Sequence, residues 1–204
     1  MTAKAAINQR TRQREATRRQ LVEAGLRVVA VSGFAGASTA AIAKATGKAH
    51  GTVFLHFRTR EALVAELVAE VGRGMSARLA ELETVAPSLS EVLDAHLKTL
   101  GENEALYSRL LGEASTLPLA ARAYIFALQS GIASRLRAAY LREHGLGRVR
   151  AIDPIALANL WIGLSNHYLL NRDLFAPGAS VIAACGALMK TQILGLVQTN
   201  QESP

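Results

Sequence analysis

Residues 33–63 constrain the fold more than any other part of this 204-residue chain. Two hydroxyl residues, Ser38 and Thr39, can cap a short alanine-rich helix that is broken at Gly47. A second short helix can follow and end in the aromatic run at 54–57. Two short helices joined by a tight turn are typical of a helix-turn-helix, whose second helix fits the DNA major groove.

This segment resembles the DNA-binding signature of the TetR family of bacterial one-component regulators. The family's ordered series of glycine, aromatic, small and basic residues corresponds here to Gly33-Phe34, Ile42-Ala43, Gly47, Gly51-Thr52, Phe54, His56-Phe57 and Arg60-Glu61-Ala62-Leu63. The resemblance covers residues 12–63 in detail. It implies an all-α protein of about nine helices. An N-terminal three-helix helix-turn-helix DNA-binding domain with a basic arm (residues 1–60) would precede a helical effector-binding and dimerisation domain (residues 61–204).

The composition agrees with an all-helical protein. Alanine and leucine are abundant, whereas the chain has only five prolines and 5% aromatic residues. The single Cys185 excludes an intrachain disulfide and a cysteine zinc cluster, so we expect a cytoplasmic protein. No signal peptide is visible. The longest apolar stretch, 179–189, is too short to span a membrane.

Positive charge is concentrated in the N-terminal part of the chain. Residues 1–60 contain 11 lysine and arginine residues and two acidic residues, whereas residues 61–204 contain 12 and 14, which together give the net charge of +7. Neutralising phosphates releases counterions and strengthens binding, so this imbalance favours a polyanion partner, here double-stranded DNA. For Arg10, Arg12 and Arg14 alone, a solvated basic tail is an equally good interpretation.

Apolar residues at helical spacing predict the helices outside the motif. They span residues 11–31, 60 to about 85, 87–101, 102–116 and 119–144, with one more beginning at Asp153-Pro154 and a last one after Pro177-Gly178. Phe34, Ile42, Val53 and Phe57 are expected to form the core of the DNA-binding domain.

Individual residues of the motif have expected roles at DNA. The helix N-terminus at Ser38 and Thr39 suits a phosphate, although plain capping is the alternative. Lys48, Ala49 and His50 are expected to begin the recognition helix, where they can reach base edges. The family more often has an aliphatic residue and then a hydroxyl residue at positions 48 and 49, so its base preference does not transfer. The resemblance assigns the DNA backbone or the groove wall to the remaining candidates, which are Gly51, Thr52, Phe54, His56 and Arg60.

For the second domain the resemblance implies a small-molecule pocket, whose occupation moves the long helix after Arg60. Polar and aromatic residues within apolar helices are the candidates for it. They are His96, Tyr107, Glu113, Tyr124, Gln129, Trp161, Asn166, His167 and Asn171. Core packing or the dimer interface is the alternative for each. A mainly apolar pocket suggests an uncharged or weakly polar organic effector.

The last two helices carry apolar residues on more than one side, so something must cover them. In the resembled family these helices pair with their symmetry mates as a four-helix bundle. The candidate interface residues are Leu164, Ala184, Cys185 and Leu188. A core made within one chain is the alternative.

These patterns predict a cytoplasmic, homodimeric transcriptional regulator. We expect a repressor that binds a palindromic operator and is released by a small organic effector, with no cofactor, metal site, catalytic residue or membrane partner. The sequence contains no glycine-rich phosphate loop and no HExxH pair. Residues 163–167 faintly resemble a nucleophile elbow but lack its second glycine and its preceding strand.

Three alternatives remain. One is a DNA-binding regulator or architectural protein with no small-molecule ligand. Another is an effector-binding module whose DNA motif has decayed, although the intact Gly51-Thr52 and His56-Phe57 argue against it. The third is a membrane-surface role for the basic arm at 10–19, which lacks the bulky apolar face of such helices.

Overall fold

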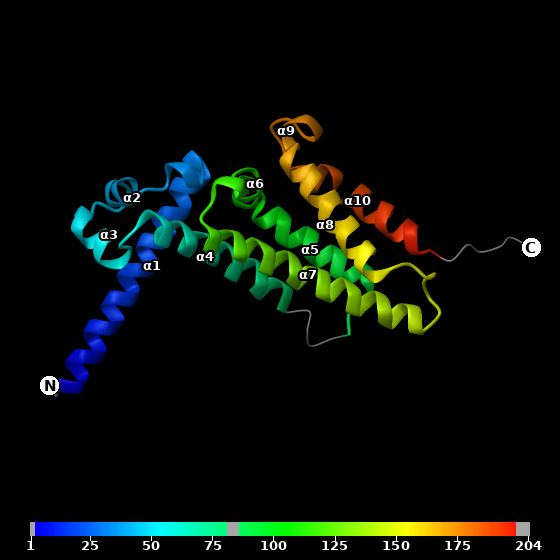
Figure 1. The fold of residues 1–204 in the computed structure, drawn as a ribbon, viewed down its shortest axis with the longest axis horizontal. Coiled ribbons are helices and arrows are strands. Elements are labelled where there is room, and N and C mark those ends of the chain that lie inside the picture. The colour runs from blue at the N-terminus through cyan, green and yellow to red at the C-terminus, as the bar shows by residue number, and fades with distance from the viewer. Residues whose placement is uncertain (1–2, 81–85, 199–204) are drawn as a thin grey trace, which may run out of the picture. The chain divides into compact units, whose positions relative to one another are not determined.

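The computed structural model describes residues 3–80 and 86–198, in which it shows ten α-helices, one 3-10 turn and no strand (Figure 1). The helices are α1 (Ala3–Gly36), α2 (Thr39–Thr46), α3 (His50–His56), α4 (Arg60–Ala80), α5 (Leu89–Glu102), α6 (Glu104–Gly112), α7 (Leu119–Gly145), α8 (Pro154–Leu170), α9 (Arg172–Phe175) and α10 (Val181–Val197), with the 3-10 turn η1 at Ala114–Thr116. The predicted all-α fold is confirmed. The expected number of helices was short by the four-residue α9. The predicted end of the fourth helix near Val85 lies outside the described residues.

The chain divides into two compact units. The first contains the described residues up to Glu70 together with Glu113–Arg122. The second contains the described parts of Val71–Gly112 and Ala123–Pro204. The functional division at residue 60 stays a prediction. A segment far along the chain, 113–122, thus packs with the N-terminal helices.

The core of the first unit is the predicted one. Phe34, Ile42 and Val53 are fully buried and Phe57 is 1% exposed. Helix α1 extends beyond the expected 11–31 at both ends, and its regular conformation is interrupted at Gly33, where φ is 70°. This left-handed conformation suits glycine, because a side chain would be strained there.

Local capping sets the turn of the helix-turn-helix. The hydroxyl of Ser38 accepts the N–H of Ala41 at 3.1 Å and begins α2. Gly47 ends α2 in a left-handed conformation, with φ 64°. The expected start of the recognition helix at Lys48 was wrong by two residues: Ala49 is extended and caps α3, which begins at His50.

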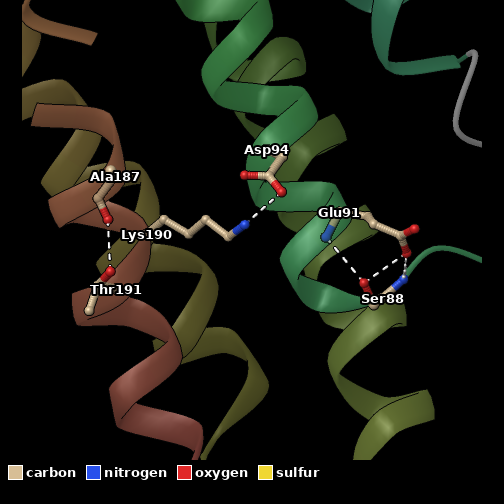
Figure 2. A network of polar contacts seen from close by, with 6 residues as sticks. All are labelled: Ser88, Glu91, Asp94, Ala187, Lys190 and Thr191. Atoms are coloured by element: carbon tan, nitrogen blue, oxygen red, sulfur yellow. Dashed lines mark hydrogen bonds and ion pairs between the residues drawn. The ribbon is translucent and has the colours of Figure 1, made fainter. Parts of the chain in front are cut away.

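Side chains also cap the helices of the second unit. Ser88 and Glu91 form a capping box at the start of α5, as Figure 2 shows. Figure 2 also shows Lys190 of α10, whose ammonium donates to Asp94 of α5 at 2.6 Å. The expected helix at 102–116 is instead α6 followed by the short turn η1. Asp153 caps α8 as predicted, and Pro154 lies in the first turn of that helix.

Glu104, in the first turn of α6, holds the start of α10. Its carboxylate accepts the hydroxyl of Ser180 at 2.5 Å and the N–H groups of Val181 at 3.0 Å and Ile182 at 3.3 Å. An anionic side chain at a helix N-terminus satisfies free N–H groups and interacts favourably with the helix dipole. The first turn of α6 therefore fixes where α10 begins.

In the described part of the chain, no helix combines the length and the apolar character that crossing a membrane requires.

Candidate DNA interface and effector pocket

Helix α3 presents an exposed side and buries the opposite one. Ala49, His50 and Gly51 are exposed, and Phe54 is 44% exposed. Val53 faces inward as predicted. Short polar and small residues on the exposed side of a second motif helix are what the major groove admits.

The first turns of the two motif helices are linked by one hydrogen bond. The hydroxyl of Thr39 and Nε2 of His50 are 2.9 Å apart. Two of the predicted DNA contacts, from α2 and α3, therefore lie together. Thr52 and His56 are half-buried on α3, and Ser38 serves the cap of α2.

Arg18 of α1 anchors the end of α3, a role that sequence reasoning missed. Its guanidinium donates to the carbonyl of His56 at 3.2 Å and pairs with Glu66 at 2.5 Å. It also lies 4.6 Å from the ring centroid of Phe57. Sequence spacing could not predict this role, because the contact joins residues that are 38 positions apart.

The side chain of Arg60 binds backbone carbonyls at the end of α1. Its Nη2 donates to the carbonyls of Phe34 at 3.0 Å and Ala35 at 3.1 Å. The resemblance assigned Arg60 to a DNA phosphate, and that role stays a prediction. The structure gives this guanidinium an internal task, because it satisfies carbonyls at the end of α1.

Glu113 binds the backbone N–H groups of the same two residues. Its carboxylate accepts the N–H of Phe34 at 3.0 Å and the N–H of Ala35 at 2.8 Å. A Cβ atom at Gly33 would collide with this carboxylate. Glu113 was expected in the effector pocket, but the structure places it in the first unit, where it binds the backbone of the last turn of α1.

His56 lies in a positively charged setting. Burial lowers the pKa of its imidazole, and the nearby charges of Arg14, Arg18 and Lys48 lower it further. A cationic surface beside the end of α3 matches the phosphate backbone that flanks a major groove.

The second unit contains a small pocket between helices. Four of the nine predicted ligand residues line it: His96, Tyr107, Gln129 and Asn166. The other lining residues are Met75, Leu128, Ile132, Ile162 and Ser165. Its free volume is about 10 Å³, which is room for about one water molecule. An organic effector would therefore have to displace side chains.

The polar groups of this pocket are neutral at physiological pH. Burial lowers the pKa of His96 to about 4, and Nδ1 of this imidazole accepts the indole N–H of Trp161 at 2.9 Å. Burial also raises the pKa of Tyr107, which hydrogen-bonds the side chain of Gln129. These groups can bind a neutral polar ligand but offer no opposite charge to an ionic one.

Comparison with known proteins agrees with the motif. The family model described as "Bacterial regulatory proteins, tetR family" matches residues 21–67. Residues 21–67 therefore match the DNA-binding segment of that family. A curated relative, the HTH-type transcriptional repressor AcnR of Corynebacterium efficiens, is 28% identical over 190 residues, which cover 92% of this chain and 94% of the relative.

Solved structures of transcriptional regulators share the fold of this chain. PfmR from Thermus thermophilus, a TetR family transcriptional regulator, has a TM-score of 0.70 at 20% identity and covers 86% of this chain and 97% of its own. FadR from Bacillus subtilis in complex with stearoyl-CoA gives 0.70 at 17% identity and covers 88% and 98%. A putative regulator from Saccharomonospora viridis in complex with choline gives 0.73 at 18% identity and covers 91% and 100%.

The remaining ligand candidates lie outside the pocket. Trp161 is fully buried and reaches the pocket only through His96. Tyr124 is 45% exposed on α7. His167 and Asn171 are exposed at the end of α8, where the Asn171 amide donates to the His167 carbonyl at 2.8 Å. Sequence patterns could not separate these positions from the pocket, because polar residues in apolar helices look alike wherever the fold places them.

The predicted interface residues lie on α8 and α10. Ala184 is exposed and Leu188 is 52% exposed, four residues apart on α10. Leu164 and Cys185 are half-buried. Exposed apolar residues one helical turn apart give α10 an apolar strip, which a second copy of this chain could cover.

Proposed function

We infer that the chain is a DNA-binding transcriptional regulator of the TetR family. We propose that it is a homodimeric repressor, that it binds a palindromic operator, and that a small neutral organic molecule in the pocket of the second unit lowers its operator affinity. The proposal that an effector controls operator affinity rests on the position of α6 in the chain, between the pocket and Glu113. This helix contributes Tyr107 to the pocket and runs into Glu113, which binds the backbone of the DNA-binding unit.

At the operator, α3 enters the major groove. Lys48 and His50 are the donors nearest to base edges, and Ala49 can touch a thymine methyl group. Ser38, Thr39, Thr52 and Phe54 contact the backbone or the groove wall, and Gly51 permits close approach. The two α3 helices of a dimer read half-sites about one DNA turn apart, roughly 34–36 Å.

We expect an effector to act by enlarging the pocket. Because the pocket has room for about one water molecule, an organic ligand must separate Tyr107 from Gln129 or shift α6. Glu113 follows α6 directly in the chain, so a shift of α6 strains the hydrogen bonds of Glu113 to Phe34 and Ala35. The effector then favours a conformation in which the DNA-binding unit fits the operator less well, and the coupling works in both directions.

The lining of the pocket indicates the chemical class of the effector. Neutral hydrogen-bonding groups are interspersed with Met75, Leu128 and Ile132. Burying an ion among these groups would be costly. The complexes of structurally similar proteins with stearoyl-CoA and with choline show that this fold accommodates ligands, and they support an effector site in general.

Selection of binding sites from a random duplex pool at physiological salt tests the DNA part. A palindrome with half-sites about one turn apart is expected. Recovery of no sequence, with binding that vanishes as salt rises, would leave only electrostatic attraction and contradict the proposal.

The selected duplex then serves as the probe for the effector. Thermal-shift screening of matched neutral and charged organic compounds should yield neutral hits, which raise Tm by preferential binding to the folded state and release the probe. The variant Gln129→Met keeps the volume but removes the partner of Tyr107. This variant should bind the selected compounds less tightly, while its affinity for the operator stays unchanged. Stabilising compounds that never release the duplex would favour the alternative, a regulator that no small molecule controls.

A further inference from the structure

A groove lies beside the end of the recognition helix within the first unit. It is lined by Thr11, Arg14, Glu15 and Arg18 of α1 and by His56 of α3, and its volume is about 290 Å³. That volume is enough for a phosphate group with its hydration water.

The helical register of α1 directs one row of side chains to this groove. At 100° per residue, Thr11, Arg14 and Arg18 lie within about 60° of one another around the helix axis. Arg12 and Arg19 lie about 80–160° away from the members of this row. The basic arm therefore has a side that faces α3 and a side that does not.

The charges around the groove leave it positive. Arg18 pairs with Glu66 of α4. Arg14 and Lys48 add positive charge near His56, and Glu15 is the acidic residue that lines the groove. A bound anion would relieve the repulsion that the imidazolium form of His56 experiences there.

We propose that this groove holds a phosphate of the DNA backbone, with the guanidinium of Arg14, the imidazole of His56 and the hydroxyl of Thr11 as its donors. The proposal rests on the proposed function and extends the DNA contacts to α1. DNA in contact with α3 must pass its backbone along the end of that helix, where the groove lies.

Phosphate binding also predicts proton uptake. The groups that face His56 are Arg14, Glu15 and Arg18 of α1 and Lys48 before α3, with Glu66 of α4 reaching it through Arg18. Their net effect disfavours the imidazolium, whereas a phosphate at hydrogen-bond distance favours it. DNA should therefore raise the pKa of His56, and binding should tighten as pH falls from 8 to 6.

The test compares Arg14→Ala with Arg12→Ala, which removes the same charge from a position on α1 that does not line the groove. Binding to one random-sequence duplex is measured by fluorescence anisotropy from 50 to 200 mM salt. One phosphate contact contributes about 0.9 to the slope of log affinity against log salt. Across this fourfold rise, the wild type should lose about 3.5-fold more affinity than Arg14→Ala and about as much as Arg12→Ala.

A second readout follows the His56 imidazole by NMR in wild type and in Arg12→Ala, with and without the duplex. Its pKa should rise when the duplex binds. An unchanged salt slope in Arg14→Ala, equal losses of slope in both variants, or a duplex-independent pKa of His56 would each overturn the groove assignment. Failure of the wild type to bind any duplex at 50 mM salt would contradict the proposed function itself.

Discussion

The carboxylate of Glu113 accepts the backbone N–H of Phe34 at 3.0 Å, and the two residues are 79 positions apart in the chain. The same carboxylate accepts the N–H of Ala35, while Arg60 donates to the carbonyls of both Phe34 and Ala35. In the last turn of α1, an anion thus accepts the two backbone N–H groups and a cation donates to the two carbonyls. Such charge-assisted hydrogen bonds are stronger than neutral ones.

Replacing Glu113 by Gln should loosen this segment. The amide oxygen can accept one N–H, but the amide nitrogen cannot accept the second, and the negative charge is lost. We expect the free energy of unfolding to fall by about 1 kcal/mol. Effector release of the operator should also weaken, because the residue that follows α6 in the chain then holds the last turn of α1 less firmly. Urea denaturation and operator titration with effector measure the two effects.

Glu23→Gln is the matched control, since Glu23 is an exposed residue of α1 in the same unit. It removes the same charge and should change neither quantity. Equal effector response in wild type and Glu113→Gln would show that coupling takes another route.

The buried His96 makes stability depend on pH. Its pKa is about 4 in the folded protein and about 6.5 ordinarily, so the unfolded chain binds more protons between these values. The stabilisation from the neutral imidazole is fully present above pH 6.5 and is lost as pH falls toward 4. The linkage amounts to about 3 kcal/mol. Urea denaturation at pH 7.5 and pH 4.5 measures most of it.

His96→Gln removes the titrating group but keeps an oxygen that can accept the indole N–H of Trp161. Its stability should fall less than that of the wild type over the same pH interval. Parallel loss in both proteins would assign the acid sensitivity to other groups.

The DNA motif was predictable from sequence because its signals are local. Gly47 must supply a left-handed turn and Ser38 a cap, and four apolar residues of the motif define the small core. The pocket was only half predictable. His96 and Glu113 carry the same kind of signal, a polar residue in an apolar helix, yet one lines the pocket and the other binds backbone 79 residues away. Only the tertiary fold decides between these outcomes.

Lys48 should determine which duplex is preferred. It lies half-buried in the turn before α3, and its ammonium can donate to guanine O6 or N7. Lys48→Ala should relax selectivity at one base position by about 1–3 kcal/mol, whereas Thr52→Ala should weaken binding to all duplexes alike. Competition between the selected operator and single-base variants measures this change in selectivity.

Lys44→Ala is the control. It removes an equal charge on the exposed side of α2 and should leave the ranking of duplexes unchanged. An unchanged ranking in Lys48→Ala would refute its role in base reading.

The exposed strip on α10 should be the dimer contact. Leu188 is 52% exposed, and in a dimer its side chain would be buried against the partner. Leu188→Glu would bury a charge there without a counter-ion, so we expect monomers by light scattering. Operator affinity should fall with dimerisation, because a monomer reads only one half-site.

Leu146→Glu supplies the control, since Leu146 is 59% exposed just after α7 and lies on neither α8 nor α10. It should remain dimeric with full operator affinity. A dimer that survives Leu188→Glu but not Leu146→Glu would move the interface to the end of α7. Loss of the dimer in Leu188→Glu with unchanged operator affinity would separate dimerisation from DNA recognition and contradict the palindromic mode of binding.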